Sequence, residues 1–236
     1  MEDSVLIRQL NSVRTNILNT CEHMQIPKEA VCLIAVSKTK PVSMIKEVYQ
    51  AGIRDFGENK VQELIDKYEQ LPKDIRWHLI GHLQTNKVKY VVGKTTLIHG
   101  VDSIKLAKEI SKEAQKKQID VDILIQVNIA NEETKYGFKE EEVIDRVIEI
   151  SKMEGIHIKG LMIIAPYVDN SEENRLYFQK MKQLYVDIIQ KNIDNVHMEV
   201  LSMGMTGDYQ VAIEEGASCV RVGTAIFGMR DYANSH

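Results

Sequence analysis

The segment VCLIAVSK, residues 31–38, is a short, mostly apolar run that ends in a lysine. Its composition predicts a buried β-strand that delivers one amine at its carboxyl end. Neighbours that desolvate such an amine lower its pKa from about 10.4 and populate the neutral form, which can attack a carbonyl. In a parallel barrel, sites are built at the carboxyl ends of the strands. Lys38 is therefore the first candidate for a Schiff-base residue.

The rest of the chain alternates between short runs rich in Val, Ile and Leu and longer stretches with helical spacing. The expected strands are residues 31–37, 53–57, 75–80, 97–101, 121–128, 156–164, 196–202 and 218–224. The expected helices are residues 3–22, 42–51, 58–69, 84–92, 103–117, 139–152, 171–191 and 207–215.

This order of elements predicts a (β/α)8 TIM-type barrel, an α/β fold, with an additional N-terminal helix and with residues 1–236 as a single domain. Residues 121–128, VDILIQVN, are nearly continuous apolar sequence, which is typical of a strand covered on both faces. An open doubly wound sheet is the alternative, because strand counting alone does not exclude it. Residues 37–41 contain nothing like GxGxxG, and the chain has no Walker A sequence. We therefore favour the barrel.

The composition excludes several classes of protein. The formal net charge of −4 gives no electrostatic reason to expect nucleic acid as a partner. No apolar run reaches the roughly 18 residues of a membrane span, and the start MEDS lacks the apolar stretch of a signal peptide. Cys32 and Cys219 lie in apolar runs and are expected to be small core residues. Together these features predict a cytoplasmic protein without membrane partners.

Two glycine-rich segments follow the seventh and eighth expected strands: LSMGMTGD (residues 201–208) and VRVGTAIFG (residues 220–228). In many barrel enzymes a phosphate binds between these two loops, at a short helix N-terminus. Glycines let backbone N–H groups approach phosphate oxygens, and Ser202, Thr206 and Thr224 can donate hydroxyl hydrogen bonds. Either segment alone is explained by chain turns. Both together, at these two strands, favour a phosphate site.

Arg221 is placed inside the last expected strand, between Val220 and Val222, so alternation points its side chain into the barrel. A salt bridge to an inward carboxylate is an equally good reading from the residues alone. If a pyridine ring occupies the barrel mouth, the guanidinium can only donate to the ring nitrogen. That nitrogen would stay unprotonated, and the ring would be a weaker electron sink than one paired with Asp.

Five blocks of the chain together carry a family resemblance: AVSKTKP (35–41), FGEN (56–59), WHLIGHLQTNK (77–87), LSMGM (201–205) and VRVGTAIFG (220–228). They resemble the pyridoxal-phosphate homeostasis proteins, a family similar to the N-terminal barrel of alanine racemase and of related decarboxylases. The match spans essentially the whole chain. The resemblance implies a fold type III barrel that binds pyridoxal 5′-phosphate (PLP).

The resemblance also implies residue roles. Lys38 would carry PLP as an internal aldimine, and Arg221 would face the pyridine nitrogen. The expected phosphate-binding residues are Ser202, Gly223 and Thr224, with Gly204, and the expected pocket-lining residues are Asn59 and His82. One departure is TGD at residues 206–208, where the family more often has Ser followed by an acidic residue. Thr206 keeps the hydroxyl, whereas Gly207 changes how the loop closes on a phosphate.

Three functions are compatible with these residues. A PLP-dependent racemase or decarboxylase needs a second acid or base, which another domain supplies as a tyrosine in racemase-like enzymes. The chain ends about a dozen residues after its last strand, and Tyr136, Tyr167 and Tyr209 are more simply rim or packing residues. A hydrolase or aldolase that uses Lys38 without a cofactor is another possible function. We expect a monomeric, non-catalytic carrier that buffers PLP or delivers it to apo PLP-dependent enzymes.

Other polar residues carry weaker signals. His78 and His82 have the i, i+4 spacing of a helical metal pair, but residues 77–80 read as a strand, so no metal site is expected. Lys135 follows the fifth strand, and from the residues alone an exposed loop lysine is favoured; the resemblance makes a second amine at the mouth an equal reading. His99 lies in an expected strand and is expected to be structural.

Overall fold

The computed structural model describes residues 4–130, 132 and 135–229. Eight parallel strands form a closed barrel, because β4 pairs with β5 and joins the two halves of the sheet. These strands are β1 (Cys32–Val36), β2 (Asp55–Glu58), β3 (Arg76–Leu79), β4 (Leu97–Val101), β5 (Val121–Asn128), β7 (Ile156–Ile163), β8 (Val196–Ser202) and β9 (Cys219–Val222). The short β6 (Phe138–Lys139) extends β5 outside this ring.

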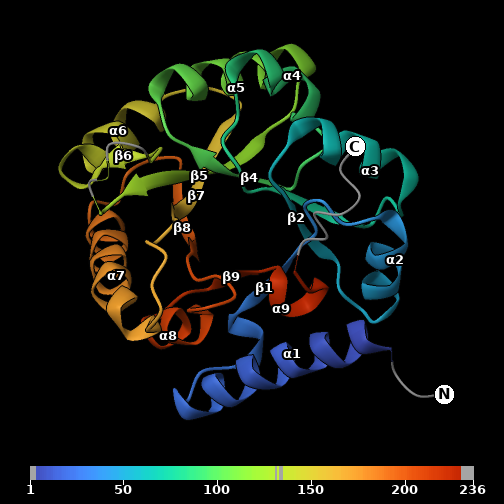
Figure 1. Cartoon of the computed structure of the whole chain (residues 1–236). Helices are drawn as coiled ribbons and strands as arrows, with labels where there is room; N and C mark the ends of the chain where they lie inside the picture. Colours follow the sequence, from blue (N-terminus) through green and yellow to red (C-terminus); the bar gives the residue numbers. More distant parts are fainter. Residues whose placement is uncertain (1–3, 131, 133–134, 230–236) are drawn as a thin grey trace.

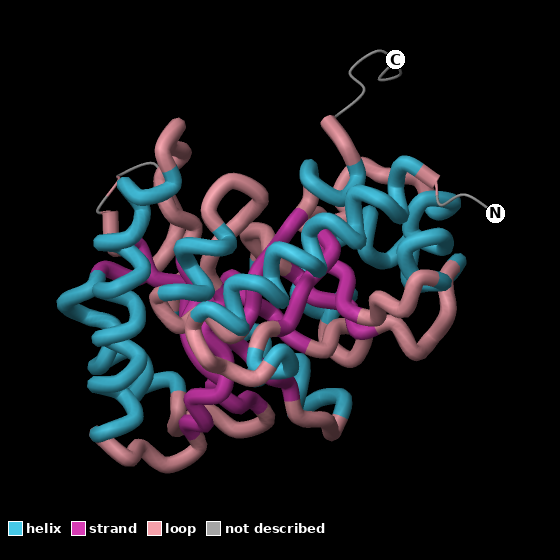
Figure 2. The backbone as a smooth tube through the Cα atoms, turned by 90° about the horizontal axis from the view of Figure 1, so that it is seen from below, coloured by secondary structure: helices cyan, strands magenta, loops and turns pink. Residues whose placement is uncertain are grey.

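Helices surround the barrel, and Figure 1 looks along it with the strands at the centre. The α-helices are α1 (Val5–His23), α2 (Val42–Gln50), α3 (Val61–Gln70), α4 (Val88–Val91), α5 (Ile104–Lys117), α6 (Val143–Ile150), α7 (Arg175–Gln190), α8 (Tyr209–Glu214) and α9 (Thr224–Phe227). Short 3-10 turns are η1 (Lys28–Ala30), η2 (Thr85–Lys87), η3 (Glu140–Glu142) and η4 (Ser171–Asn174). Figure 2 shows from below that the strands form the centre and the helices lie outside them.

The predicted barrel is confirmed, and the open sheet is wrong because the β4–β5 pairing leaves no open edge in the ring. Each expected strand agrees with the observed one to within two residues at either end. The third expected helix begins later than predicted, at Val61, because Glu58 belongs to β2. The four-residue α9 was not predicted, since it is too short for a helical period to be visible.

The apolar core has two parts. Most of it lies between the strands and the helices, where Phe56 and Trp77 pack with their ring centroids 6.0 Å apart. Smaller clusters occupy the barrel interior, and one of them contains Ile34, Val36 and Cys219. Alternate residues of β1 therefore face inward, while Ala35 packs toward the helices.

Helix α1 packs on the outside of the barrel against α8 and α9. Its N-cap is Ser4, whose hydroxyl accepts a hydrogen bond from the Ile7 N–H group. Its buried face is made by Leu6, Leu10, Val13, Ile17, Thr20 and Cys21, which recur at helical spacing. Across the part of the chain that the structure describes, no helix has the length and apolar character needed to cross a bilayer.

Gly160 is the glycine that the strand packing constrains most. It lies in β7 with φ +149°, at a point where the register with both neighbouring strands shifts. A Cβ at this position would lie 1.8 Å from the Val200 carbonyl oxygen in β8. Only glycine therefore fits this close approach of two backbones.

Gly160→Ala is expected to lower the free energy of unfolding by more than about 3 kcal/mol, because the clash and the unfavourable φ cannot both be relieved. Gly207→Ala is the matched control: nothing lies within 4 Å of its added Cβ. That variant should stay within about 0.5 kcal/mol of the parent protein. Urea unfolding measures both, and equal midpoints for the two variants would contradict this account of β7.

Candidate functional site

Lys38 follows the end of β1 by two residues and is partly buried. β1 lies between β2 and β9, with Val36 opposite Gly57 and Ala35 opposite Val222. Since alternate residues of β1 face inward, the same alternation directs Lys38 to the inner side of the barrel mouth. The side chain of Lys38 therefore begins just beyond the point where β1 pairs with β2 on one side and with β9 on the other.

Arg221 in β9 points into the barrel, as expected, and its side chain is only 4% exposed. Among the described residues its hydrogen-bond partners are neutral oxygens: Nη2 donates to the Ile163 carbonyl at 2.7 Å and Nη1 donates to Ser202 Oγ. Burial lowers the pKa of the guanidinium. An arginine nevertheless keeps its proton in proteins and acts only as a donor. Arg221 is thus a buried cation on the strand next to β1.

A line of hydrogen bonds continues from Ser202 across the barrel. His99 Nδ1 lies 3.0 Å from Ser202 Oγ, and His99 Nε2 lies 3.0 Å from His78 Nδ1. His78 Nε2 in turn lies 3.1 Å from Asp55 Oδ1. We call Arg221, Ser202, His99, His78 and Asp55 the interior chain; its members come from five different strands.

Asp55 is ionised at one end of the interior chain, and His99 in its middle is neutral. Burial lowers the pKa of His99 well below its usual value, and the nearby charges of His78 and Arg221 lower it further, so the ring is neutral. Burial opposes ionisation of Asp55, but hydrogen bonds from His78 and Arg76 outweigh it and bring its pKa to about 2. His78 donates from Nε2 to Asp55, and a neutral His99 donates through one ring nitrogen and accepts through the other.

The N-terminus of α9 forms a backbone cradle beside β1. Thr206 Oγ1 accepts from the N–H groups of Gly223 and Ala225, at 3.3 and 3.4 Å. A Cβ on Gly223 would come within 3.3 Å of the Val36 carbonyl oxygen, so glycine permits this close approach. Thr224 is exposed at the same turn. The two N–H groups converge on one oxygen, as they would on an oxygen of an anion.

Ser202 and Gly204, at the end of β8, are both buried. The Ser202 side chain is fully buried in the interior chain rather than at the rim. Gly204 has φ +90°, and a Cβ there would lie 2.6 Å from Ala212 Cβ of α8. Its carbonyl oxygen accepts from the Arg221 N–H group at 3.0 Å. Gly204 therefore fixes the path of the loop and ties it to β9.

Asn59 and His82 lie at the ends of β2 and β3, next to each other. A Cβ on Gly81 would lie 2.4 Å from the Asn59 carbonyl oxygen, so these two loops touch. Asn59 Oδ1 is buried and has no hydrogen-bond partner among the described residues. His82 Nδ1 lies 2.7 Å from Asp102 Oδ2, and the His82 ring stacks on Tyr136 with centroids 3.7 Å apart.

The structure brings all of the predicted residues to the carboxyl ends of strands or to the turns that follow them, and Ser202, Gly204 and Arg221 are the buried ones among Lys38, Asn59, His82, Ser202, Gly204, Arg221, Gly223 and Thr224. The sequence indicates the Thr206 hydroxyl as a possible donor but does not assign it to the cofactor site, whereas the structure places it at the turn of α9. The sequence does not indicate Asp102, which fixes His82, because no local spacing links two residues in successive strand–helix loops.

The other polar residues considered above have the following surroundings. Lys135 Nζ pairs with Glu132 Oε1 at 2.7 Å, while the neighbouring residues 131, 133 and 134 lie outside the described part. His78 and His82 face different partners, and the described residues contain no group of three or more ligands suited to a metal. Tyr167 is 93% exposed. The Tyr209 hydroxyl accepts from Asn16 of α1, away from the mouth.

Comparison with known proteins gives a match over nearly the whole chain. The family described as "Alanine racemase, N-terminal domain" matches residues 9–231. A pyridoxal phosphate homeostasis protein of Aquifex aeolicus is 44% identical over 225 residues, which is 95% of this chain and 98% of the relative. A protein of the same name from Escherichia coli is 35% identical over 97% of this chain and 98% of its own length.

Solved structures agree with this match. PipY of Synechococcus elongatus, solved with PLP bound, aligns with a TM-score of 0.82 and 34% identity, over 94% of this chain and all of that one. An alanine racemase of Clostridium difficile aligns with a TM-score of 0.68 over 93% of this chain and 60% of its own. At 16% identity the second likeness concerns the fold alone.

The resemblance carried by the five sequence blocks is confirmed by these matches. The chain belongs to the alanine racemase N-terminal domain family and, within it, to the pyridoxal phosphate homeostasis proteins.

Proposed function

We propose that this chain binds PLP through a Schiff base to Lys38 and serves in intracellular PLP homeostasis. One observation carries the proposal: a lysine follows β1, and the neighbouring strand β9 and the turn after it provide a buried arginine and a backbone cradle. An amine, a cation and an anion cradle are what an aldehyde, a pyridine nitrogen and a phosphate need. The names of the relatives and the PLP bound to PipY support it.

The described residues fit this cofactor. Asn59 Oδ1 is a buried acceptor that a ligand hydroxyl can satisfy. The N–H groups of Gly223 and Ala225 are shared with one threonine hydroxyl at long distances, and a charged oxygen is a stronger acceptor for them. We assign the phosphate to Gly223, Thr224 and Thr206, with Gly204 shaping the loop.

PLP supplies an aldehyde that condenses with amines and a ring that withdraws electrons. Arg221 can only donate toward a ring nitrogen, and its own protons are fixed by Ser202 and the Ile163 carbonyl. The interior chain therefore fixes the position of the guanidinium. The ring nitrogen would then face a hydrogen-bond donor and no acceptor. We assign the Ser202 side chain to this task rather than to the phosphate.

A carrier, rather than a racemase or decarboxylase, is the function we propose. A nitrogen kept unprotonated weakens the ring as an electron sink, which damps carbanion chemistry. Of the three tyrosines considered as a second acid or base, Tyr209 is turned toward α1, Tyr167 is almost fully exposed and Tyr136 stacks on His82. We propose that the chain works in the cytoplasm as a monomeric single domain and hands PLP to apo PLP-dependent enzymes.

Protein incubated with PLP is expected to gain a visible band at about 420 nm, and borohydride should fix one ligand on Lys38. Lys38→Ala should lose the covalent label, because no other residue is proposed to form the imine. Lys46→Ala, which removes an exposed lysine of α2, is the matched control and should label normally. Mass mapping of peptides reads the outcome, and a visible imine in Lys38→Ala would refute the assignment.

A carrier should show at most marginal turnover with a panel of L- and D-amino acids, measured by chiral chromatography. Loaded protein mixed with an apo PLP-dependent enzyme should restore that enzyme's activity faster than the spontaneous release of PLP allows. Robust racemisation or decarboxylation would overturn the carrier in favour of an enzyme. Restoration no faster than release would reduce the role to buffering.

Ser202→Ala should destabilise the protein by about 1–3 kcal/mol, since it leaves His99 Nδ1 and an Arg221 N–H group buried without a partner. It should also shift the absorption band of the PLP complex. Ser218→Ala is the control, because that hydroxyl bonds the backbone of Leu201 and Glu199 instead. An unchanged band together with weaker competition by inorganic phosphate would instead make Ser202 a phosphate ligand.

A further inference from the structure

The turn that carries Lys38 has an unusual backbone. Thr39 adopts φ +63°, in the left-handed region that β-branched residues rarely enter. Such a conformation costs on the order of 1–3 kcal/mol and persists only where surrounding contacts hold it. Lys38 and Thr39 are the two central residues of a turn in which the Lys40 N–H group donates to the Ser37 carbonyl at 3.0 Å.

Helix α3 holds both peptide groups that flank Lys38. Lys67 Nζ donates to the Ser37 carbonyl at 2.7 Å, which is the peptide group before Lys38. Glu63 Oε1 accepts from the Thr39 N–H group, which belongs to the peptide group after it. Glu63 and Lys67 are one helical turn apart and also pair with each other at 2.7 Å.

Glu58 anchors this arrangement from β2. Its Oε1 accepts from Ser37 Oγ at 2.6 Å and from Lys67 Nζ at 2.7 Å, and the residue has no exposed surface. Burial raises the pKa of the carboxyl group, although Lys67 opposes this, and Oε2 has no partner among the described residues. A buried ion pair of this kind often stabilises a fold no better than apolar residues of similar size. Stability alone therefore does not account for it.

We infer that Glu58, Glu63 and Lys67, which we call the Lys38 clamp, are positioning residues for the amine that takes up PLP. The inference rests on the proposed function of Lys38. The amine nitrogen forms a bond to the aldehyde carbon, and the aldehyde oxygen leaves as water. Because both flanking peptide groups are held, the position of the Lys38 Cα atom is fixed. This matters for the rate, because displacement of a reacting group by about 1 Å can slow a reaction roughly 100-fold.

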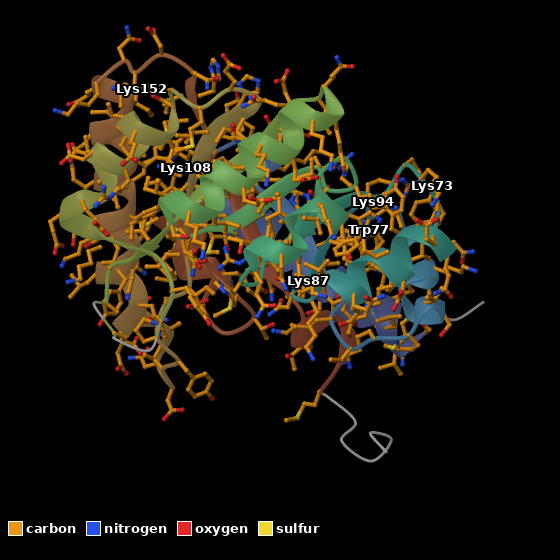
Figure 3. The ribbon with its side chains drawn as sticks, turned by 90° about the horizontal axis from the view of Figure 1, so that it is seen from above. Lys73, Trp77, Lys87, Lys94, Lys108 and Lys152 are labelled. Carbon is orange, nitrogen blue, oxygen red and sulfur yellow. The ribbon has the colours of Figure 1, made fainter. Side chains whose placement is uncertain are left out.

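Two clamp variants test the inference. Glu63→Ala releases the Thr39 N–H group at a partly exposed position. The double variant Lys67→Met, Glu58→Gln removes the Lys67 bond to the Ser37 carbonyl, which keeps only the Lys40 N–H group as a partner, without leaving an unpaired buried charge. Lys94→Met is the control, because Lys94 forms an ion pair of the same 2.7 Å length with Glu69 near the outer surface. Figure 3 shows Lys94 beside Lys73 there.

Stopped-flow absorbance with PLP measures imine formation, and 4′-deoxypyridoxine 5′-phosphate, which lacks the aldehyde, measures the pocket itself. Each clamp variant should form the imine at least about 10-fold more slowly than wild type. The same variants should bind the aldehyde-free analogue within about twofold of wild type, as should Lys94→Met in both assays. Glu63→Gln keeps an oxygen that can accept from Thr39 and should recover most of the rate.

The outcomes separate the inference from the proposed function. If wild type is not labelled at Lys38 after borohydride, both are wrong. If wild type is labelled and the clamp variants react at its rate, only the inference is wrong. If the variants lose affinity for the aldehyde-free analogue in proportion to the rate, or fail to fold while Lys94→Met folds, the cluster is structural and the inference is again overturned.

Discussion

Period-two alternation along β1, inside a closed ring of strands, is the constraint on which the rest of the site depends. A strand that is covered by helices on one side and by seven other strands on the other must sort its side chains strictly between two environments. Ile34 and Val36 fill the interior, whereas Ser37 turns outward to Glu58 and α3. A slip of one residue would exchange these sides and send the amine of Lys38 toward the helices.

The barrel interior is only partly apolar, and its polar groups form a line with a charged residue at each end. Positive charge on Arg221 lies near the mouth, and negative charge on Asp55 lies at the start of β2, with Ser202 and two histidines between them. Arg221 donates to neutral oxygens, whereas Asp55 also forms an ion pair with Arg76, so the charged groups at both ends have hydrogen-bond partners. The arrangement explains how one small barrel keeps a permanent cation beside a site without a carboxylate in contact with it.

The sequence predicted most of the fold, because parallel strands buried on both faces leave continuous apolar runs that are easy to recognise. It also predicted the inward direction of Arg221 from its two apolar neighbours. It failed where partners are remote: Ser202 meets His99, 103 positions away, across the barrel, and no local pattern announces that contact. The contacts of Glu63 and Lys67 with the turn of Lys38 are hidden for a related reason, since two charges one helical turn apart are typical of a solvated pair.

The β1–β9 pairing has a consequence for synthesis of the chain. The lysine leaves the ribosome early, whereas the arginine and the turn of α9 emerge near the end of translation. A nascent chain therefore carries Lys38 before β9 and α9, which complete its surroundings in the folded barrel, have been made. The pairing of the first and last strands is a long-range contact and forms slowly, so these surroundings are complete only once the ring has closed.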